Sequence, residues 1–292
     1  MGVLYLVATP IGNLEDITLR ALRILREVRL IAAEDTRHTR QLLTHYTITT
    51  PCISYHEHNK LSRLDDVLAA LAQGDVALVS DAGTPALSDP GLELVVACIA
   101  AGMTVIPIPG PTAPVSALVA SGLSTARFLY LGFLPRRSSE RRVVFEDVVE
   151  LAATLICFEA PHRLVDSLAD ALAVLGDRRI VLAKDITKRF EVLYRAPLSA
   201  ALAYVQAQPP RGEYTLVIEG ATLPEGRSKR DRQRLQTNGM ATAEPPSEAE
   251  IVRRLRILRA EGQAGSAAAR AVARELGVQK SLVYQIWLSL EQ

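Results

Sequence analysis

The sequence contains few cysteines and no long uninterrupted hydrophobic segment. Its three cysteines, Cys52, Cys98 and Cys157, lie far apart inside apolar segments and form no C-x-x-C pair. This spacing favours buried free thiols over a disulfide or a zinc site. The longest apolar run, residues 94–109, is interrupted by glycine and proline, so it predicts a helix, a turn and a strand instead of a membrane span. No basic segment precedes the short apolar N-terminal stretch, and we expect a soluble cytoplasmic protein without a signal peptide.

Several common catalytic and nucleotide-binding motifs are also missing. The chain has no G-x-x-x-x-G-K-[ST] phosphate loop and no G-x-S-x-G nucleophile turn, so it gives little support to the enzyme classes that use them. Dinucleotide-binding enzymes carry G-x-G-x-x-G after the first strand, whereas this chain has "ATPIGN" at residues 8–13. A loop with one glycine and a rigid proline is not a pyrophosphate cradle.

What the sequence does contain is a regular alternation of apolar and amphipathic segments. Its 292 residues, 49% of them hydrophobic, suffice for two domains with large cores. Strand-like segments separated by helices predict an α/β fold built from βαβ units with a largely parallel sheet. Ten strands are many for one sheet, so we predict two α/β lobes with a cleft between them, 1–113 and 114–222. The predicted strands are 3–8, 30–33, 52–55, 76–80, 104–108, 128–132, 154–158, 180–183, 192–194 and 214–218; helices are predicted at 61–71, 92–101, 111–122, 141–151 and 164–175.

The C-terminal part differs in composition from the rest. Residues 223–246 are charged and polar, as in a flexible linker, and residues 247–292 predict a small helical domain. Ser247 and Glu250 form a capping box for a helix over 247–260. An alanine-rich helix, a turn at 276–278 and a helix from about residue 279 follow, with the spacing of a helix-turn-helix. A three-helix bundle used only for packing is the alternative.

Charge supports a nucleic-acid role for this C-terminal part. Residues 225–292 carry 12 Lys and Arg against 8 Asp and Glu, a net charge of +4, whereas the preceding residues carry 21 against 24, a net of −3. A basic tail on a mildly acidic body suggests contact with a polyanion. A merely solvated basic surface would give the same counts.

Five loops that directly follow predicted strands concentrate the unusual chemistry. In parallel sheets, ligands bind beyond the carboxyl ends of the strands, so these loops are the candidate site: residues 9–13, 34–38, 54–59, 80–85 and 109–113. Simpler interpretations exist for several of their side chains. Asp81 could form a turn and Thr112 could cap a helix, while Glu34 and Asp35 suit a first helical turn.

One of these loops contains a pair of histidines. His56 and His58 flank Glu57 in "SYHEHN", and two alternate histidines with a carboxylate could suggest a metal site. A third ligand is missing in the sequence, however, and zinc sites require at least three protein ligands. We therefore predict no metal.

Taken together, these loops resemble one known family. The segments "LYLVATPIGNLEDIT", "AEDTRHTRQLL", "SYHEHN", "VSDAGTPALSDPG", "IPGPTA", "FEAPHRL" and "GEYTLVIEG" resemble the ribosomal RNA small-subunit methyltransferase I group. That group belongs to the tetrapyrrole-methylase-fold, or class III, S-adenosylmethionine-dependent methyltransferases. The resemblance spans nearly all of residues 1–221 and returns in the C-terminal helices. It implies a homodimer that methylates the ribose 2′-hydroxyl of cytidine 1402 in 16S rRNA. We expect the RNA to be taken within the 30S subunit, and naked rRNA stays open as the alternative substrate.

The resemblance also implies where the cofactor lies. In this family S-adenosylmethionine occupies the cleft between the two lobes, and it has no pyrophosphate, so no glycine-rich cradle is needed. The first loop is then free to face the methyl acceptor, with Asn13 on the outer side. The positions that match the family's cofactor-binding segments are Pro10, Asp81, Ala82, Gly83, Thr84, Thr112, Ala113, Phe158, Glu159, Ala160, Tyr214 and Thr215.

The implied reaction needs help from the acceptor side, because a ribose hydroxyl is a poor nucleophile until its proton is removed. The candidate bases are Glu34, Asp35 and His56, with Arg37 and Lys188 as charge partners, and catalysis by alignment alone stays open. The predicted RNA-binding residues are Lys188, Arg253, Arg254, Arg256 and Lys280. Two other functions compete: methylation of a tetrapyrrole or other small acceptor, and an S-adenosylmethionine-sensing DNA-binding regulator.

Overall fold

The computed structural model describes residues 2–222, 248–260, 263, 265–276, 283, 286 and 287. The chain divides into two compact units, Met1–Thr222 and Leu223–Gln292, and each is described by itself. The predicted linker at 223–246, the cap at Ser247, the turn after Leu276 and Lys280 lie outside the described residues. No helix in the described part of the chain is long and apolar enough to cross a membrane.

The first sheet of the larger unit is entirely parallel, as predicted. Its strand order is β3-β2-β4-β1-β5, and β1 pairs in parallel with both β4 and β5. Short apolar strands of this kind suit a sheet that is covered on both faces. The strands are β1 (Leu4–Val7), β2 (Leu30–Ala33), β3 (Cys52–Ser54), β4 (Val76–Val79) and β5 (Val105–Ile108).

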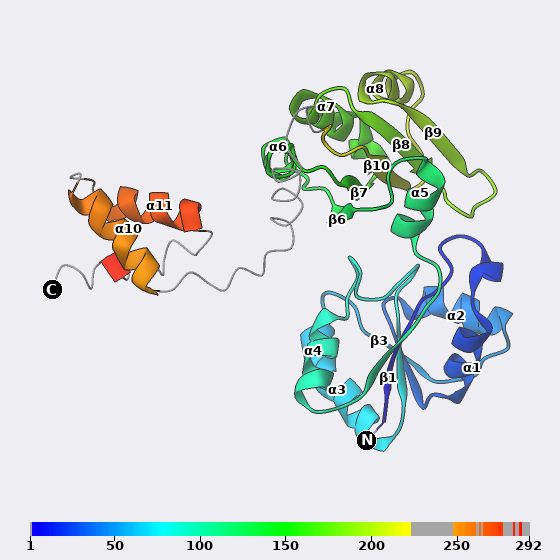
Figure 1. Ribbon diagram of the computed structural model, residues 1–292. Coiled ribbons are helices and arrows are strands. Elements are labelled where there is room, and N and C mark those ends of the chain that lie inside the picture. Colours follow the sequence, from blue (N-terminus) through cyan, green and yellow to red (C-terminus); the bar gives the residue numbers. More distant parts are fainter. Residues whose placement is uncertain are drawn as a thin grey trace. The chain divides into compact units, whose positions relative to one another are not determined.

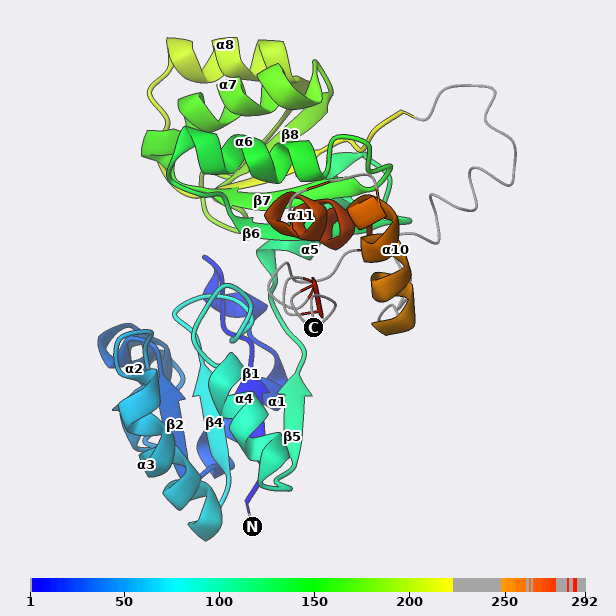
Figure 2. The same ribbon diagram turned by 90° about the vertical axis from the view of Figure 1, so that its left-hand side faces the viewer.

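Helices cover both faces of this sheet (Figures 1 and 2). α1 (Leu19–Glu27) and α2 (Thr36–His45) share one apolar core with alternate strand residues. α3 (Lys60–Gln73) and α4 (Leu92–Ala100) share another core on the opposite face. Successive side chains of a strand point to opposite faces of the sheet. Because helices cover both faces, all four residues of β4 are buried.

The second sheet contradicts the expectation of largely parallel pairing. Its order is β6-β7-β10-β8-β9; only β6 and β7 are parallel, and the other neighbours are antiparallel. Alternating strands and helices determine the direction of consecutive strands but not which strands become neighbours. Here the last strand lies between two that run the opposite way. The strands are β6 (Phe128–Phe133), β7 (Thr154–Glu159), β8 (Arg179–Lys184), β9 (Val192–Pro197) and β10 (Tyr214–Ile218).

Four helices pack on the second sheet. Figure 2 shows α6 (Ser138–Asp147), α7 (Leu164–Leu175) and α8 (Leu198–Ala207) together on one face, while α5 (Ala113–Ser121) packs on the other through Ala117 and Leu118. The helix predicted over 141–151 begins earlier and ends at Asp147. Beyond it the Val148 N–H donates to the Phe145 carbonyl, a tighter turn that keeps apolar residues facing the core without continuing the helix.

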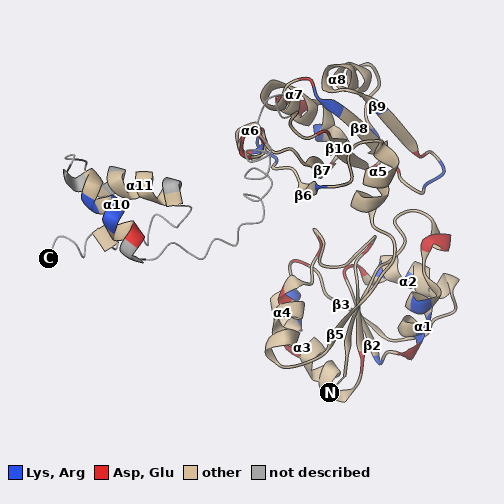
Figure 3. Ribbon diagram, in the orientation of Figure 1, with Lys and Arg blue, Asp and Glu red and all other residues tan. Residues whose placement is uncertain are grey.

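The described part of the smaller unit consists of two helices around one apolar core. α10 (Glu248–Ala260) and α11 (Gly265–Leu276) pack together through Leu255 and Val272, with Val283 and Trp287 completing the core. Basic residues of α10 are visible in Figure 3. Small alanines on α11 allow the two helices to approach closely.

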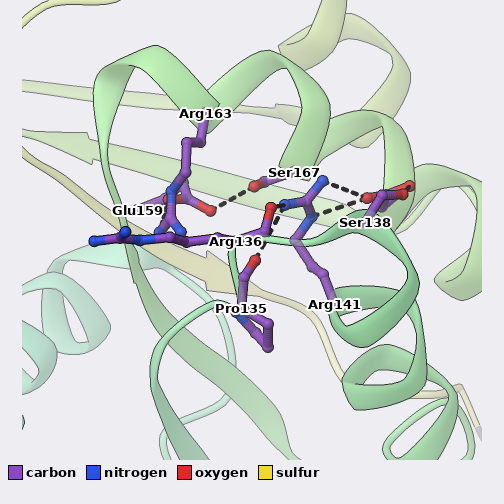
Figure 4. A network of polar contacts seen from close by, with 8 residues as sticks. Pro135, Arg136, Ser138, Arg141, Glu159, Arg163 and Ser167 are labelled. Carbon is purple, nitrogen blue, oxygen red and sulfur yellow. Dashed lines mark hydrogen bonds and ion pairs between the residues drawn. The ribbon is translucent and has the colours of Figure 1, made fainter.

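A buried ion pair joins α6 to α7 in the second lobe (Figure 4). The Arg141 guanidinium donates from Nε to Asp170 Oδ2 at 2.8 Å, and the two side chains are 3% and 12% exposed. Ser138 Oγ donates to the other carboxylate oxygen at 2.9 Å. The guanidinium also donates to the carbonyls of Pro135 and Arg136. One side chain thus fixes two helices and the segment that follows β6.

Replacing Asp170 with alanine should lower the free energy of unfolding by about 3–5 kcal/mol, because it leaves the Arg141 guanidinium buried without its counter-charge. Urea titration of the full chain measures the effect. Glu27→Ala is the control, since Glu27 pairs with Arg23 at the surface, where both side chains are more than half exposed, and should cost about 1 kcal/mol or less. Equal losses in both variants would show that the buried ion pair stabilises the fold no more than the surface ion pair does.

Candidate functional site

The candidate site lies at the carboxyl edge of the first sheet, where the loops after β1, β4 and β5 are bonded to one another. Thr9 and Gly83 exchange backbone hydrogen bonds of 2.8 and 3.0 Å, and Thr9 Oγ1 donates to the Ser80 carbonyl. Thr84 Oγ1 donates to the carbonyl of Pro111 at 3.3 Å. The first loop of the chain therefore serves as a support for the loop after β4.

Glycine at position 83 is required by the backbone. Gly83 has φ +80°, a left-handed conformation that side-chain-bearing residues adopt at a cost. A Cβ there would also lie 3.4 Å from the Ile11 side chain. The glycine of "SDAGTP" thus makes the pairing with the first loop possible.

The loop after β2 joins the same structure through two carboxylates. The Asp35 N–H donates to Asp81 Oδ1 at 2.9 Å, and the Asp81 N–H donates to Glu34 Oε2 at 3.2 Å. Asp81 therefore does more than form its own turn. It connects two loops and lies beside a cavity.

A cavity of ≈ 390 Å³ opens between the two lobes of the larger unit, a size typical of small-molecule sites. Both lobes contribute to its wall. Its lining residues are Ile11, Glu34, Asp81, Ala82, Gly83, Thr84, Leu87, Asp89, Thr112, Ala113, Pro114, Phe133, Phe158, Glu159, Ala160, Pro161, Gly212, Glu213, Tyr214 and Thr215. The set includes every position predicted to bind the cofactor except Pro10, whose neighbour Ile11 lines the cavity instead.

The predicted catalytic residues are distributed differently, because only Glu34 lines the cavity. The Asn13 side chain accepts a hydrogen bond from the Glu15 N–H and caps the short helix η1 (Leu14–Asp16). The Asp35 carboxylate caps α2 by accepting from the Arg37 N–H at 2.8 Å, and it also pairs with the exposed Arg37 guanidinium. Asp35 is thus the N-cap of α2, one position before the first helical turn in which the simpler interpretation placed it.

His56 lies just after β3, away from the cavity wall. Its N–H donates to Asn59 Oδ1 at 2.7 Å, and its ring contacts that of His58 edge-on at 6.1 Å between centroids. His56 Nδ1 is buried, and no partner for it occurs among the described residues. Within the same part of the chain no group of three His, Cys, Asp or Glu side chains is placed to hold a metal ion.

The carboxyl groups around the cavity differ in acidity. The Arg37 guanidinium holds the pKa of Asp35 well below its usual range. Burial raises the pKa of Glu34, and the nearby negative charge of Asp81 adds to the rise. Burial and the charge of Glu34 raise the pKa of Asp89 to about 7. A carboxyl group that shares its site with other carboxylates resists ionisation.

Asp89 and Glu213 are the two acidic cavity residues that the sequence did not predict. Asp89 is the one with the raised pKa. It follows β4 in "VSDAGTPALSDPG", where "SDPG" has the composition of an ordinary turn. The chain curls back toward the cavity because Ala86 and Ser88 adopt left-handed conformations, with φ +67° and +65°. Neither residue type signals this conformation, so only the position of the motif after a strand could have drawn attention to Asp89.

An aromatic cluster from the second lobe forms another part of the cavity wall. Phe158 on β7 packs against Tyr130 and Phe133 of β6, with ring centroids 5.5 and 5.2 Å apart. The Tyr130 hydroxyl forms a 2.8 Å hydrogen bond with Ser88 Oγ. The loop after β4 is thereby bonded to both lobes.

Glu159 lines the cavity, but its carboxylate is occupied within the second lobe (Figure 4). It accepts a hydrogen bond from the Ala160 N–H at 2.7 Å and another from Ser167 Oγ, and it pairs with Arg163 at 2.5 Å. This fully buried side chain holds the segment after β7 in place. What the segment offers to the cavity is therefore mainly backbone and the Phe158 ring.

Of the predicted RNA-binding residues, Lys188 belongs to the larger unit and is not among the residues that line the cavity. Lys188 pairs with Glu213 at 2.8 Å. On α10, Arg253 pairs with Glu250 at 2.9 Å, Arg254 lies 3.6 Å from the same carboxylate, and Arg256 is exposed.

The sequence matches known proteins over most of its length. The family Tetrapyrrole (Corrin/Porphyrin) Methylases matches residues 3–202. "Ribosomal RNA small subunit methyltransferase I" of Synechocystis sp. is 46% identical over 293 residues, covering 100% of this chain and 99% of that protein. The protein of the same name from Halalkalibacterium halodurans is 51% identical over 220 residues, covering 75% of this chain and 76% of its own length.

Solved structures agree with the described fold. The crystal structure of diphthine synthase has a TM-score of 0.57 at 16% identity, covering 76% of this chain and 92% of that one. Uroporphyrin-III-C-methyltransferase from Thermus thermophilus has a TM-score of 0.52 at 20% identity, covering 75% and 94%. At this level of identity the likeness extends to the α/β fold with two sheets.

Replacing Asp89 with asparagine should stabilise the protein at about pH 8, by about 1–3 kcal/mol after allowance for solvent screening. The pKa of Asp89 is raised from 3.8 to about 7. Between these values the unfolded chain releases the proton while the folded chain keeps it, so the parent loses stability as pH rises. Below about pH 4 both states are protonated, and the difference between parent and variant should vanish.

Urea titrations of both proteins across this pH range measure the effect. Asp65→Asn, at an exposed position on α3, is the matched control. A variant no more stable than the parent at high pH would mean that the Asp89 carboxylate is not destabilised by its surroundings.

Proposed function

Because the chain belongs to the tetrapyrrole (corrin/porphyrin) methylase family and, within it, to the ribosomal RNA small subunit methyltransferase I group, we propose that it methylates the 2′-hydroxyl of cytidine 1402 in 16S rRNA. The methyl donor is S-adenosylmethionine, and the substrate is the RNA within the 30S subunit. The enzyme acts in the cytoplasm as a homodimer. The observation that carries the proposal is the similarity over the whole chain to a protein of that name.

The cavity fits a cationic cofactor without phosphate. Among the described residues that line it are five acids and no lysine, arginine or histidine; the acids are Glu34, Asp81, Asp89, Glu159 and Glu213. Such a lining repels phosphate groups and attracts positive charge. S-adenosylmethionine carries a sulfonium and an ammonium group, and the aromatic wall at Phe133 and Phe158 suits its adenine ring.

The residues proposed to hold the cofactor come from four segments, two of them loops of the first lobe and two at strand ends of the second lobe. The loop at 81–84 supplies the Asp81 carboxylate and backbone groups, and Thr112 and Ala113 supply the neighbouring wall. Phe158–Ala160 and Tyr214–Thr215 complete it from the second lobe. When bound, the cofactor supplies a methyl carbon activated by the positive sulfur to which it is attached. The protein's task is to orient that carbon toward the ribose oxygen and to exclude water.

Among the three predicted bases, Glu34 has the most suitable surroundings. It lines the cavity, and its pKa is raised by burial, which brings a carboxylate closer to the basicity that proton abstraction near neutral pH requires. Asp35 is a weaker base because Arg37 stabilises its charged form. Asn13, Asp35, Arg37 and His56 are proposed to shape the acceptor side of the site.

The C-terminal unit is proposed to be a helix-turn-helix-like domain that docks the enzyme on RNA. Its exposed Arg256, together with Arg253, Arg254 and Lys280, would contact phosphates. A tetrapyrrole acceptor has weaker support, because the structures of tetrapyrrole-modifying enzymes match this chain in fold at about 20% identity, which says nothing of the acceptor.

The decisive experiment is a methylation assay with the full chain. Purified protein, labelled S-adenosylmethionine and 30S particles from a strain lacking the enzyme should give one 2′-O-methyl group at cytidine 1402, located by nuclease digestion and mass spectrometry. Naked rRNA and a tetrapyrrole serve as alternative acceptors. Transfer to another nucleotide, to the tetrapyrrole alone, or to nothing would contradict the proposal.

Glu34→Gln should lower kcat by about 10²–10⁴-fold, the usual contribution of a general base, while the cofactor Kd changes only a few-fold. Glutamine can still accept the hydrogen bond from the Asp81 N–H, so the loop should keep its conformation. Asp35→Asn is the comparison variant, since the exposed Asp35 carboxylate is bound to Arg37. Its kcat should fall less than about tenfold. Single-turnover kinetics on 30S particles and calorimetry of cofactor binding separate these outcomes. A larger loss in Asp35→Asn would transfer the role to Asp35.

A further inference from the structure

The turn between β8 and β9, residues 185–191, presents an exposed aromatic side chain beside basic ones. It reads "DITKRFE", and Figure 3 shows basic residues at this turn. The Phe190 side chain is 72% exposed, the most of the five phenylalanines. Packing within the fold gives no reason for a ring of this size to remain in water.

This turn is attached to the wall of the cavity. The Asp185 N–H donates to the Glu213 carbonyl at 3.0 Å, and Asp185 Oδ1 accepts from the Glu213 N–H at 3.2 Å. Lys188 Nζ pairs with the Glu213 carboxylate at 2.8 Å. Glycine at 212 is needed for this contact, because a Cβ there would collide with the Asp185 carboxylate. Gly212 and Glu213 both line the cavity.

The turn also reaches the first loop of the chain. A Cβ at Gly12 would collide with the Lys188 side chain, so Lys188 lies directly against the loop proposed to face the methyl acceptor. Arg189 and Phe190 follow immediately in sequence. They therefore belong to the same turn whose Lys188 contacts the first loop and pairs with the cavity-lining Glu213.

The conformation of the turn is held in place by its own hydrogen bonds. Asp185 and Thr187 adopt left-handed backbone conformations, with φ +49° and +68°, which are unfavourable for side-chain-bearing residues. The Thr187 N–H donates to Glu191 Oε2 at 2.6 Å, and the Lys188 N–H donates to the Asp185 carbonyl at 2.9 Å. Strained backbone that is maintained in this way is typical of functional segments.

Arg189 and Phe190 together have the chemistry of a stacking site. The guanidinium carbon of Arg189 lies 5.6 Å from the centre of the Phe190 ring, a cation–π distance. Proteins recognise single-stranded RNA by stacking unpaired bases on exposed aromatic rings and arginine planes, with basic side chains on the phosphates. A protein partner would require a contiguous apolar patch depleted of charge, whereas Phe190 lies between exposed Arg189 and Glu191.

We propose that Arg189 and Phe190 stack on an unpaired base next to the methylated nucleotide and hold it at the rim of the cavity. The inference rests on the proposed function, since it requires an RNA substrate. It assigns to the second lobe a direct contact with RNA, separate from the C-terminal unit.

The test compares the affinity of the full chain for 30S particles and its KM for them in four variants. Base–aromatic stacking of about 1–3 kcal/mol corresponds to a 5- to 150-fold loss of affinity in Phe190→Ala, with unchanged cofactor Kd. Phe190→Trp should restore parent behaviour, while Phe190→Leu should remain impaired because it is apolar but cannot stack. Leu61→Ala, at a side chain on α3 that is also 72% exposed, should resemble the parent.

Each other outcome has a distinct meaning. If the parent methylates 30S particles and Phe190→Ala does so with the same KM, the stacking site is wrong and the proposed function stands. If Phe190→Leu behaves like the parent, or Phe190→Ala loses its dimer by light scattering, the ring serves an apolar or protein contact and the inference is overturned. If the parent methylates no RNA, the proposed function fails and the stacking site fails with it.

Discussion

Parallel pairing in the first sheet is the constraint on which the site depends. Because β1, β2, β4 and β5 run in the same direction, the loops that follow them must leave the sheet at the same edge. The backbone bridge between Thr9 and Gly83 and the carboxylate contacts of Asp81 then convert that closeness into a fixed arrangement. The second lobe contributes the remaining part of the cavity wall.

The sequence could predict the elements from apolar runs and turn residues, and the first-lobe loops of the cavity from motifs that follow strands, since these are local signals. The second-lobe positions of the cavity were implied only by the resemblance to a known family. All ten predicted strands occur. The order of the second sheet was out of reach because neighbours are chosen by long-range packing. Short polar side chains were equally ambiguous, because the same residue types occur as helix caps and as catalytic groups. Asn13 and Asp35 cap helices here. Asp89 was not predicted as a cavity residue, because the amino-acid composition of the preceding segment does not indicate the left-handed backbone at Ala86 and Ser88.

Charge is distributed in a way that suits the proposed reaction. The cavity is lined by carboxylates, whereas Lys188 of the β8–β9 turn pairs with Glu213 at the cavity wall and the exposed Arg189 follows it in that turn. On the proposed function, phosphates of the RNA are attracted to this turn and repelled from the cavity. A ribose hydroxyl can enter while the backbone that carries it stays outside. Burial raises the pKa values of Glu34 and Asp89, and the same crowding of negative charge adds to the rise.

The position of β10 has a consequence for how the protein is made. It is the last strand in the described part of the chain, yet it lies between β7 and β8 and pairs with both. During synthesis the first sheet can form once residue 108 has left the ribosome, but β7 and β8 have no partner on that side until residue 218 follows. Their unpaired edges are exposed for that interval. Tyr214 and Thr215 lie on this strand and line the cavity, so the cavity wall is complete only after β10 has inserted between β7 and β8.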